Sequence, residues 1–139
     1  MKRPVAALFA ALLTTAVASA QSYPDDPGVG VERGIEQLNN SGQVGTVTLF
    51  NRAPDTRIVV ALHGTPEGRA QSVRIYRGPS CDDLVTAPTY ELADLKNGLS
   101  SSTVKSPEAK LLSGNYDVVV FSSTASGARA TACGHLYAS

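Results

Sequence analysis

Short β-branched runs separated by turn residues are the feature that most constrains how this chain can fold. Seven runs of four to nine residues are rich in Val, Ile, Leu, Thr and Tyr, as extended strands are. They are residues 43–51, 57–63, 72–77, 89–92, 101–105, 116–123 and 129–137. Between them lie Gly, Pro, Asn and Asp, which supply the positive or preset φ angles of tight turns. This succession predicts an all-β fold, either a Greek-key β-sandwich or a flattened barrel.

Length and composition narrow the possible function classes. A chain of 139 residues is long enough for one domain and hardly for two. Its 12 basic residues balance its 12 acidic ones, and no basic run is longer than Lys2 and Arg3. We therefore expect no nucleic-acid binding, because that affinity depends on clustered phosphate contacts.

The first 20 residues have the features of a secretory signal peptide. Lys2 and Arg3 form its charged region, Val5 to Ala18 its apolar region, and a small-residue site predicts cleavage after Ala20. The apolar region is too short to span a bilayer comfortably and no second one follows, so we expect no membrane insertion. An uncleaved membrane anchor is the alternative. The predicted location is the periplasm or the extracellular space.

The predicted signal peptide is followed by a segment that we expect to be flexible, residues 21–36, because two prolines and a glycine lie within residues 23–28. The β-domain is then predicted to occupy residues 37–139. Only residues 32–38 and 108–112 fit a helical turn. The chain thus divides into a signal peptide, a short flexible segment and one domain.

Cys81 and Cys133 are the only cysteines. In an exported protein an even number of cysteines favours a disulfide, and with two the pairing is unambiguous. Closing a loop of about 50 residues would stabilise the fold by roughly 4 kcal/mol in the chain-entropy model. Two reduced, buried thiols and a redox pair are the alternatives, although no C-x-x-C motif lowers a thiol pKa.

Alternation along the predicted strand at residues 72–77 assigns its side chains to two faces. Val73 and Ile75 point to one face, and Ser72, Arg74 and Tyr76 point to the other. The apolar pair belongs in the core. The second set should face either solvent or a site.

The strand predicted at residues 116–123 is less regular. Tyr116, Val118 and Val120 share one face, and Asp117, Val119 and Phe121 share the opposite one. Two apolar side chains therefore lie on the face that is normally wet. Either a covering loop or a binding surface would explain them.

Four segments and their order resemble a known family. Residues 73–81 (VRIYRGPSC) form a strand, a glycine turn and a Cys; residues 112–121 (LSGNYDVVVF) form a long strand; and residues 132–134 read Ala-Cys-Gly. With residues 38–49 (LNNSGQVGTVTL) upstream, they resemble the copper/zinc superoxide dismutases and related chordin-type (CHRD) domains, over residues 37–137. The resemblance implies a Greek-key β-sandwich in which Cys81 and Cys133 form the family's internal disulfide.

The family's copper ligands are replaced in this chain. Arg74, Tyr76 and Phe121 stand where the resemblance places copper-binding histidines. A guanidinium cannot ligate copper, a phenyl ring has no donor atom, and a single Tyr makes a poor site. The family's zinc-binding loop also has no counterpart between Cys81 and Tyr90. We therefore expect no copper or zinc cofactor at the family position, and we assign no catalytic residue.

Two classes of function follow. The first is a non-catalytic binding or structural module, in which Arg74, Tyr76 and Phe121 form a face for an unidentified protein or a small anionic ligand. In the simpler version the three side chains only stabilise one another, since an exposed guanidinium on an aromatic ring contributes about 0.5 to 1 kcal/mol.

The second class is an enzyme, a dismutase-like protein with a displaced metal site. His63 and His135 could form such a site with a carboxylate, because a facial triad needs two imidazoles and one carboxylate. Strand-end histidines bonded to the backbone are the simpler interpretation. Other chemistry is not indicated, because the chain has no G-x-S-x-G nucleophile elbow, no G-x-G-x-x-G and no Walker A motif.

Overall fold

The computed structural model describes residues 29–78, 81 and 87–138, which form eight strands and one short helix. The all-β class predicted from the strand pattern is confirmed. The strands are β1 (Val31–Gln37), β2 (Val44–Arg52), β3 (Asp55–His63), β4 (Val73–Arg77), β5 (Tyr90–Glu91), β6 (Leu99–Val104), β7 (Tyr116–Phe121) and β8 (Ala130–His135). The helix is α1 (Glu108–Ser113), where the sequence predicts a helical turn.

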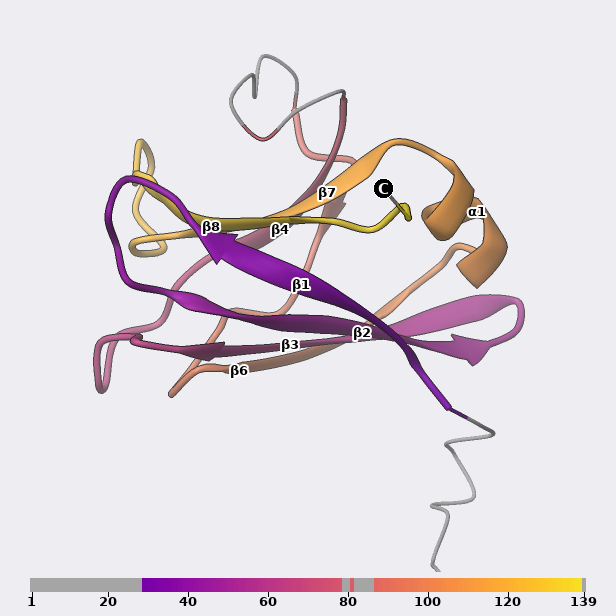
Figure 1. The fold of residues 1–139 in the computed structure, drawn as a ribbon, viewed down its shortest axis with the longest axis horizontal. Helices are drawn as coiled ribbons and strands as arrows, with labels where there is room; N and C mark the ends of the chain where they lie inside the picture. The colour runs from indigo at the N-terminus through magenta and orange to yellow at the C-terminus, as the bar shows by residue number, and fades with distance from the viewer. Residues whose placement is uncertain (1–28, 79–80, 82–86, 139) are drawn as a thin grey trace, which may run out of the picture.

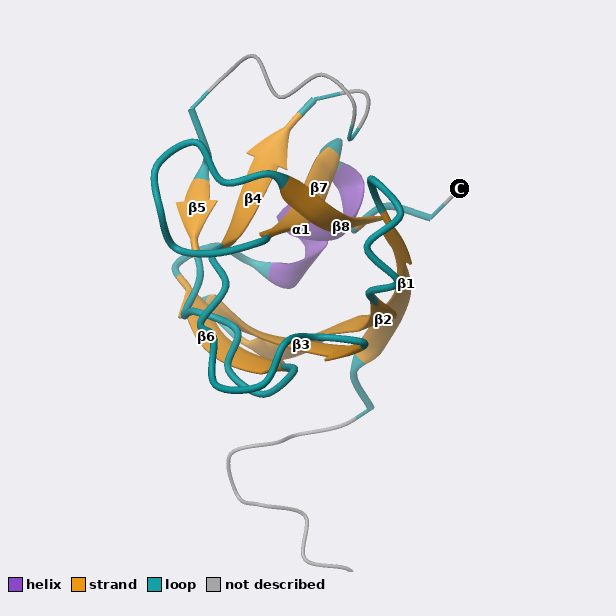
Figure 2. Cartoon of the chain, turned by 90° about the vertical axis from the view of Figure 1, so that its left-hand side faces the viewer, coloured by secondary structure: helices purple, strands orange, loops and turns teal. Residues whose placement is uncertain are grey.

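The strands form one antiparallel sheet, in the order β5-β4-β7-β8-β1-β2-β3-β6, that curls into a nearly closed, flattened barrel. Figure 1 shows β4, β7 and β8 above β2, β3 and β6, with β1 crossing between the two layers. β1 pairs with β2 through residues 31–35 and with β8 through Glu36 and Gln37. Figure 2 shows the sheet curving around, with α1 between the layers.

Serine side chains join the segment that follows β5 to the edge strand β6, without a ladder between the two edge strands. The Ala93 N–H donates to Ser102 Oγ at 2.7 Å, and Ser100 Oγ donates to the Ala93 carbonyl at 2.6 Å. These bonds satisfy backbone groups that an open edge would leave for another chain to pair with. Ser100 and Ser102 therefore have a structural role at the seam, whereas Ser101 between them accepts a hydrogen bond from Arg57 Nε at 3.1 Å.

Side chains from both layers meet in the main core of the barrel, and a smaller cluster lies outside it. β3 shows the regular pattern, with every second residue from Thr56 to Leu62 buried. Leu111 of α1 is fully buried, and α1 lies at one end of the barrel (Figure 1). The largest fully buried apolar side chains are Leu49, Ile58, Ile75, Leu95, Leu111, Leu136, Val47, Val60, Val73, Val118 and Val119.

The structure corrects the sequence prediction at residues 32–38, which form most of β1 and not a helical turn. Val31 and Ile35 are four residues apart, a spacing that fits one face of a helix as well as a strand. Gly34 weakens the helical alternative. Backbone pairing with β2, from Val31 opposite Leu49 to Ile35 opposite Gly45, decides in favour of the strand. The ordered sheet thus begins at Val31, before the boundary predicted at residue 37.

Some sequence predictions lie outside the described residues. These are the signal peptide at residues 1–20 and the flexible segment as far as residue 28. Within the described part of the chain, none of the helices has the length and apolar character needed to cross a bilayer.

Candidate functional site

The outer face of β4, β7 and β8 carries a second, smaller apolar cluster, which we call the outer cluster. Its buried members are Tyr76, Val119, Phe121 and Cys133, and Leu38, Cys81, Ala128 and Ala130 pack against them. As a result β7 is buried along its whole length on both faces. The apolar side chains that the sequence places on the wet face of this strand are therefore covered by neighbouring segments.

A disulfide between Cys81 and Cys133 connects the segment after β4 to β8, as predicted. The two Cα atoms are 6.2 Å apart, and 52 positions separate the residues in the sequence. In the ladder Cys133 stands opposite Val119 on the outer face. The bond therefore holds Cys81 over the outer cluster and keeps it covered.

Arg74, Tyr76 and Phe121 lie together on this face. The Arg74 guanidinium carbon is 5.2 Å from the centre of the Phe121 ring, and the Tyr76 and Phe121 rings meet edge to face at 6.3 Å. Tyr76 and Phe121 are only 7% and 8% exposed, whereas the Arg74 side chain is 33% exposed. The arginine is therefore the most exposed of the three. Tyr76 supports the phenyl ring from within the outer cluster.

A small pocket adjoins Arg74. It has a volume of about 180 Å³ and is lined by Ser72, Arg74, Phe121 and Ser123 and by the turn residues Ala125, Gly127 and Ala128. Its polar groups are one cation and two hydroxyls, all of which can donate hydrogen bonds. Glu91 lies beside Arg74: the Glu91 carboxylate is 3.7 Å from Arg74 Nε, and the Glu91 side chain is 74% exposed. So exposed an ion pair holds the arginine only weakly.

A β-bulge gives Phe121 its direction. The β7–β8 register shifts between Val120 and Phe121, so that Thr131 is the extra residue. The Thr131 hydroxyl donates to the buried Gln43 side chain at 2.8 Å, and Gln71 Nε2 donates to the Phe121 carbonyl at 2.8 Å. These buried hydrogen bonds fix the strand end from which the pocket's phenyl ring projects.

A larger hollow of about 600 Å³ lies elsewhere, beside residues 65–68 and Asn97. It is formed by turn residues, and Glu67 is the only charged side chain that lines it. Binding sites orient their ligands with several convergent polar groups. The smaller pocket beside Arg74 meets that requirement better than the larger hollow does.

Asp117 and His135 form a second polar group on the same outer face. They are opposite one another in the β7–β8 ladder, and His135 Nδ1 is hydrogen-bonded to Asp117 Oδ1. Asp117 is 1% exposed, and its Oδ2 is buried with no hydrogen-bond partner among the described residues. Burial raises the pKa of the Asp117 carboxyl, while the hydrogen bond and charge of His135 act in the opposite direction.

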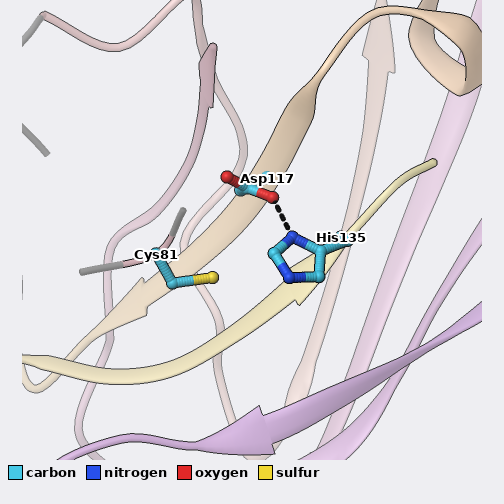
Figure 3. A group of neighbouring side chains, drawn as sticks. All are labelled: Cys81, Asp117 and His135. Atoms are coloured by element: carbon cyan, nitrogen blue, oxygen red, sulfur yellow. Dashed lines mark hydrogen bonds and ion pairs between the residues drawn. The ribbon is translucent and has the colours of Figure 1, made fainter. Parts of the chain in front are cut away.

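Figure 3 shows that the Cys81 side chain lies beside this pair. The ligand-type atoms of Cys81, Asp117 and His135 all lie within 4.8 Å of one another. The sequence indicates His135 as a metal-ligand candidate but combines it with His63, which lies at the exposed end of β3 and is not part of the group. It indicates Asp117 only as a member of the outer face.

The side chains at the positions that the family resemblance assigns to copper ligands do not suit that metal. Arg74 offers no lone pair, Phe121 has no donor atom, and the Tyr76 ring packs edge-on against Phe121 inside the outer cluster. No step of a copper-dependent reaction can be built on these three residues.

No family model, curated protein or solved structure matches the chain. The chemistry of the two polar groups on the outer face, the pocket at Arg74 and the cluster at Asp117, is therefore the main indication of function.

Proposed function

We propose that this protein is a non-catalytic binding module, an exported dismutase-like domain that holds an oxyanion beside Arg74. The oxyanion is a carboxylate or phosphate group, carried either by a small molecule or by an acidic partner protein. Support for the dismutase-like type comes from the order of the sequence motifs and from an all-β barrel whose disulfide joins the same two cysteines. Support for binding comes from the pocket.

The observation that carries the proposal is an arginine held in place at the mouth of a small polar pocket. Stacking on the Phe121 ring limits the rotamers of Arg74, so less conformational entropy is lost when a ligand binds. A guanidinium presents its donors in a planar fork that matches the two oxygens of a carboxylate or phosphate. Hydroxyls from Ser72 and Ser123 line the same pocket and can complete the oxygen's contacts.

The size of the pocket limits what it can hold. Sites for drug-sized ligands and cofactors have volumes of roughly 300 to 1,000 Å³. At about 180 Å³ the pocket beside Arg74 is below that range. It fits one oxyanion group and a few attached atoms, which favours a small anion or a single acidic side chain over an entire cofactor.

Binding can be tested by nuclear magnetic resonance titration of the labelled mature protein. The probes are inorganic phosphate, acetate and an acidic peptide, which distinguish free anions from a partner's side chain. We expect shifts at Ser72, Phe121 and Ser123. Replacing Arg74 by Gln should weaken binding at least about tenfold, because a hydrogen bond to a charged group contributes roughly 1.5 to 3 kcal/mol.

Arg77→Gln is the matched control. Arg77 is on the same strand as Arg74 and also lies over an aromatic ring, 6.0 Å from the centre of Tyr116, but it does not line the pocket. Its replacement should leave the affinity within about twofold, since a distant charge in salt solution acts weakly. Equal losses in the two variants would mean that binding depends on overall charge and would contradict the assignment to the pocket.

Glu91 provides a second check with the opposite sign. Its carboxylate both competes with a bound anion for Arg74 and repels it. Glu91→Gln should therefore raise the affinity for phosphate and acetate by about twofold to fivefold, as expected for an exposed charge worth up to about 1 kcal/mol. A fall in affinity would show that the anion binds elsewhere.

The enzyme alternative, a dismutase-like protein with a displaced metal site, makes a different prediction. It requires a redox-active metal in the purified, disulfide-bonded protein, together with superoxide dismutation. Metal analysis combined with a superoxide assay separates the two. Stoichiometric copper with dismutase activity would replace the binding proposal; weakly held zinc would not.

A further inference from the structure

The cluster of Cys81, Asp117 and His135 is not used by the proposed function, and it combines three kinds of metal ligand. Each residue comes from a different part of the chain: Cys81 from the segment after β4, Asp117 from β7, and His135 from the end of β8. Their sulfur, carboxylate oxygen and imidazole nitrogen lie within 4.8 Å of one another. Such a mixed set of sulfur, nitrogen and oxygen ligands is one that Zn²⁺ accepts.

Asp117 is the residue that the fold itself does not explain. Its side chain is 99% removed from solvent, and one of its two oxygens has no hydrogen-bond partner among the described residues. A buried polar atom without a partner costs about 1 to 3 kcal/mol, and more when it is charged. An apolar residue would continue the pattern of Val119 and Phe121 at no such cost. The unpartnered oxygen therefore indicates a ligand that is bound in another state of the protein.

The disulfide determines which state that is. While Cys81 Sγ is bonded to Cys133, it cannot become a thiolate, and metals bind thiolates strongly. The remaining pair, Asp117 and His135, offers two ligands, which is fewer than a zinc site needs. Opening the disulfide would supply the third.

We propose that the cluster is a redox-gated zinc site, absent while the disulfide is closed and created when it is reduced. An external dithiol breaks the Cys81–Cys133 bond by thiol–disulfide exchange: the dithiol becomes a disulfide, and the two cysteines become thiols. Zn²⁺ then displaces the Cys81 proton and binds its sulfur, a carboxylate oxygen of Asp117 and a nitrogen of His135. Water takes the fourth position, and Cys133 remains a free thiol.

Two single-cysteine variants test this directly. Cys133→Ser leaves Cys81 in place without any reductant, and Cys81→Ser leaves Cys133 instead. Both lose the same disulfide and therefore the same constraint on the unfolded chain. Zinc affinity is measured by competition with a chromophoric chelator, and Co²⁺ is used as a spectroscopic substitute that shows a thiolate charge-transfer band.

The proposal predicts that Cys133→Ser binds one Zn²⁺ and shows the cobalt band, and that Cys81→Ser binds at least tenfold more weakly without the band. Adding Asp117→Asn or His135→Gln to Cys133→Ser should weaken zinc binding by about 10- to 100-fold. Equal affinity in the two single variants, or a folded Cys133→Ser that binds no zinc, would overturn the proposal.

A second measurement uses the disulfide-bonded chain, in case the cysteine variants do not fold. The wild-type protein is equilibrated with mixtures of a reduced and an oxidised dithiol, either without zinc or at a free zinc concentration fixed by a chelator, and the fraction of reduced protein is measured by thiol labelling. Zinc should displace the reduction equilibrium toward the dithiol by at least tenfold, because binding stabilises only the reduced state. Asp117→Asn and His135→Gln, which keep the disulfide, should lose that shift.

A zinc effect of the same size in those two variants would mean that the cysteines alone bind the metal, and no zinc effect in the wild type would exclude the site. Both results leave anion binding at Arg74 unaffected, because neither Asp117 nor His135 lines that pocket. Failure of this proposal is thus distinguishable from failure of the proposed function.

Discussion

The two layers of the barrel bury their strands differently, and β3 and β7 show the difference most clearly. In β3 every second side chain is buried, and the others, among them Arg57 and Val59, are partly exposed. In β7 all six residues are buried, including the charged Asp117. The β3 layer is thus an ordinary two-faced sheet, whereas the β7 layer has apolar contacts on both faces.

The difference follows from what lies over each outer face. Nothing in the described part of the chain forms an apolar cluster on the outer side of β3, whereas Cys81, Leu38 and the segment at residues 128–130 cover β7. Covering a sheet face removes its polar residues from water, so the few that remain there need a specific reason. Both candidate sites, at Arg74 and at Asp117, lie on the covered side.

Of the changes that would alter the difference between the two layers, removal of the disulfide should have the largest effect. A Cys81→Ala/Cys133→Ala double variant should lose about 4 kcal/mol of unfolding free energy in the chain-entropy model, for a loop of 52 positions. Amide hydrogen exchange should also accelerate more in β7 and β8 than in β2 and β3. Uniform acceleration in all four strands would mean that the bond does not specifically protect the covered layer.

Truncating one valine on each outer face comes next. Val119 on β7 is fully buried, and Val59 on β3 is partly exposed. Val119→Ala should cost about 2 kcal/mol of unfolding free energy, because it leaves a cavity. Val59→Ala should cost about 0.5 kcal/mol, as near-surface changes do. Urea unfolding of both variants gives the comparison, and equal costs would show that the outer cluster is loosely packed.

The buried carboxylate predicts a smaller, pH-dependent effect. Burial raises the pKa of Asp117 in the folded state above the usual 3.8, so this group makes the folded state less stable as the pH rises from 3.8 through the folded pKa. Asp117→Asn lacks this titration. Its unfolding free energy relative to the wild type should therefore improve as the pH increases across that window.

Thermal unfolding of Asp117→Asn and the wild type at several values between about pH 3.5 and pH 6.5 would measure the change. The exposed Asp94, replaced by Asn, is the matched control. A difference between Asp117→Asn and the wild type that is constant with pH would show that burial does not govern this carboxyl.

The smallest difference between the layers is expected in the unfolding free energy that each loses when an arginine lying over an aromatic ring is replaced. Arg74 lies 5.2 Å from the centre of the buried Phe121 ring, and Arg57 lies 5.9 Å from that of the half-buried Phe50 in the other layer. Arg74→Ala should lower the unfolding free energy by about 1 kcal/mol and Arg57→Ala by about 0.5 kcal/mol. The reverse order, measured by urea unfolding, would show that covering the ring does not strengthen its contact with the guanidinium.

Much of the covered layer could be predicted from the sequence, because alternation is a local property. The faces of residues 73–76 and 116–121 follow from the pleat alone, and the two cysteines left a single possible pair. Residues 31–37 could not be assigned in this way, since the spacing of Val31 and Ile35 fits both a helix and a strand. Only the pairing with β2, which lies outside the segment, decides between a helix and a strand for these residues.

The Asp117–His135 pair was missed for a related physical reason. Each residue is visible in the sequence, but their meeting depends on the register between β7 and β8, which shifts by one residue at the bulge beside Phe121. That register is set by two buried hydrogen bonds, one that Gln43 accepts from Thr131 and one that Gln71 donates to Phe121, and both glutamines lie far from the two strands in the sequence. The one feature of the sequence that could have indicated this pair is the carboxylate of Asp117 within the apolar run YDVVVF.

The place of β1 between the two layers also constrains the order in which the chain can fold. β1 pairs with β2 nearby in sequence but also with β8, and Asn39 just after β1 bonds to Ala130, 91 positions later. Bringing such distant segments together costs loop-closure entropy that few contacts offset at first. Hairpins such as β2–β3 can form early, but the ring of strands cannot close until β8 is available. During synthesis the barrel therefore cannot close until β8, about 90 residues after β1, has been made, although β1 can pair with β2 before then.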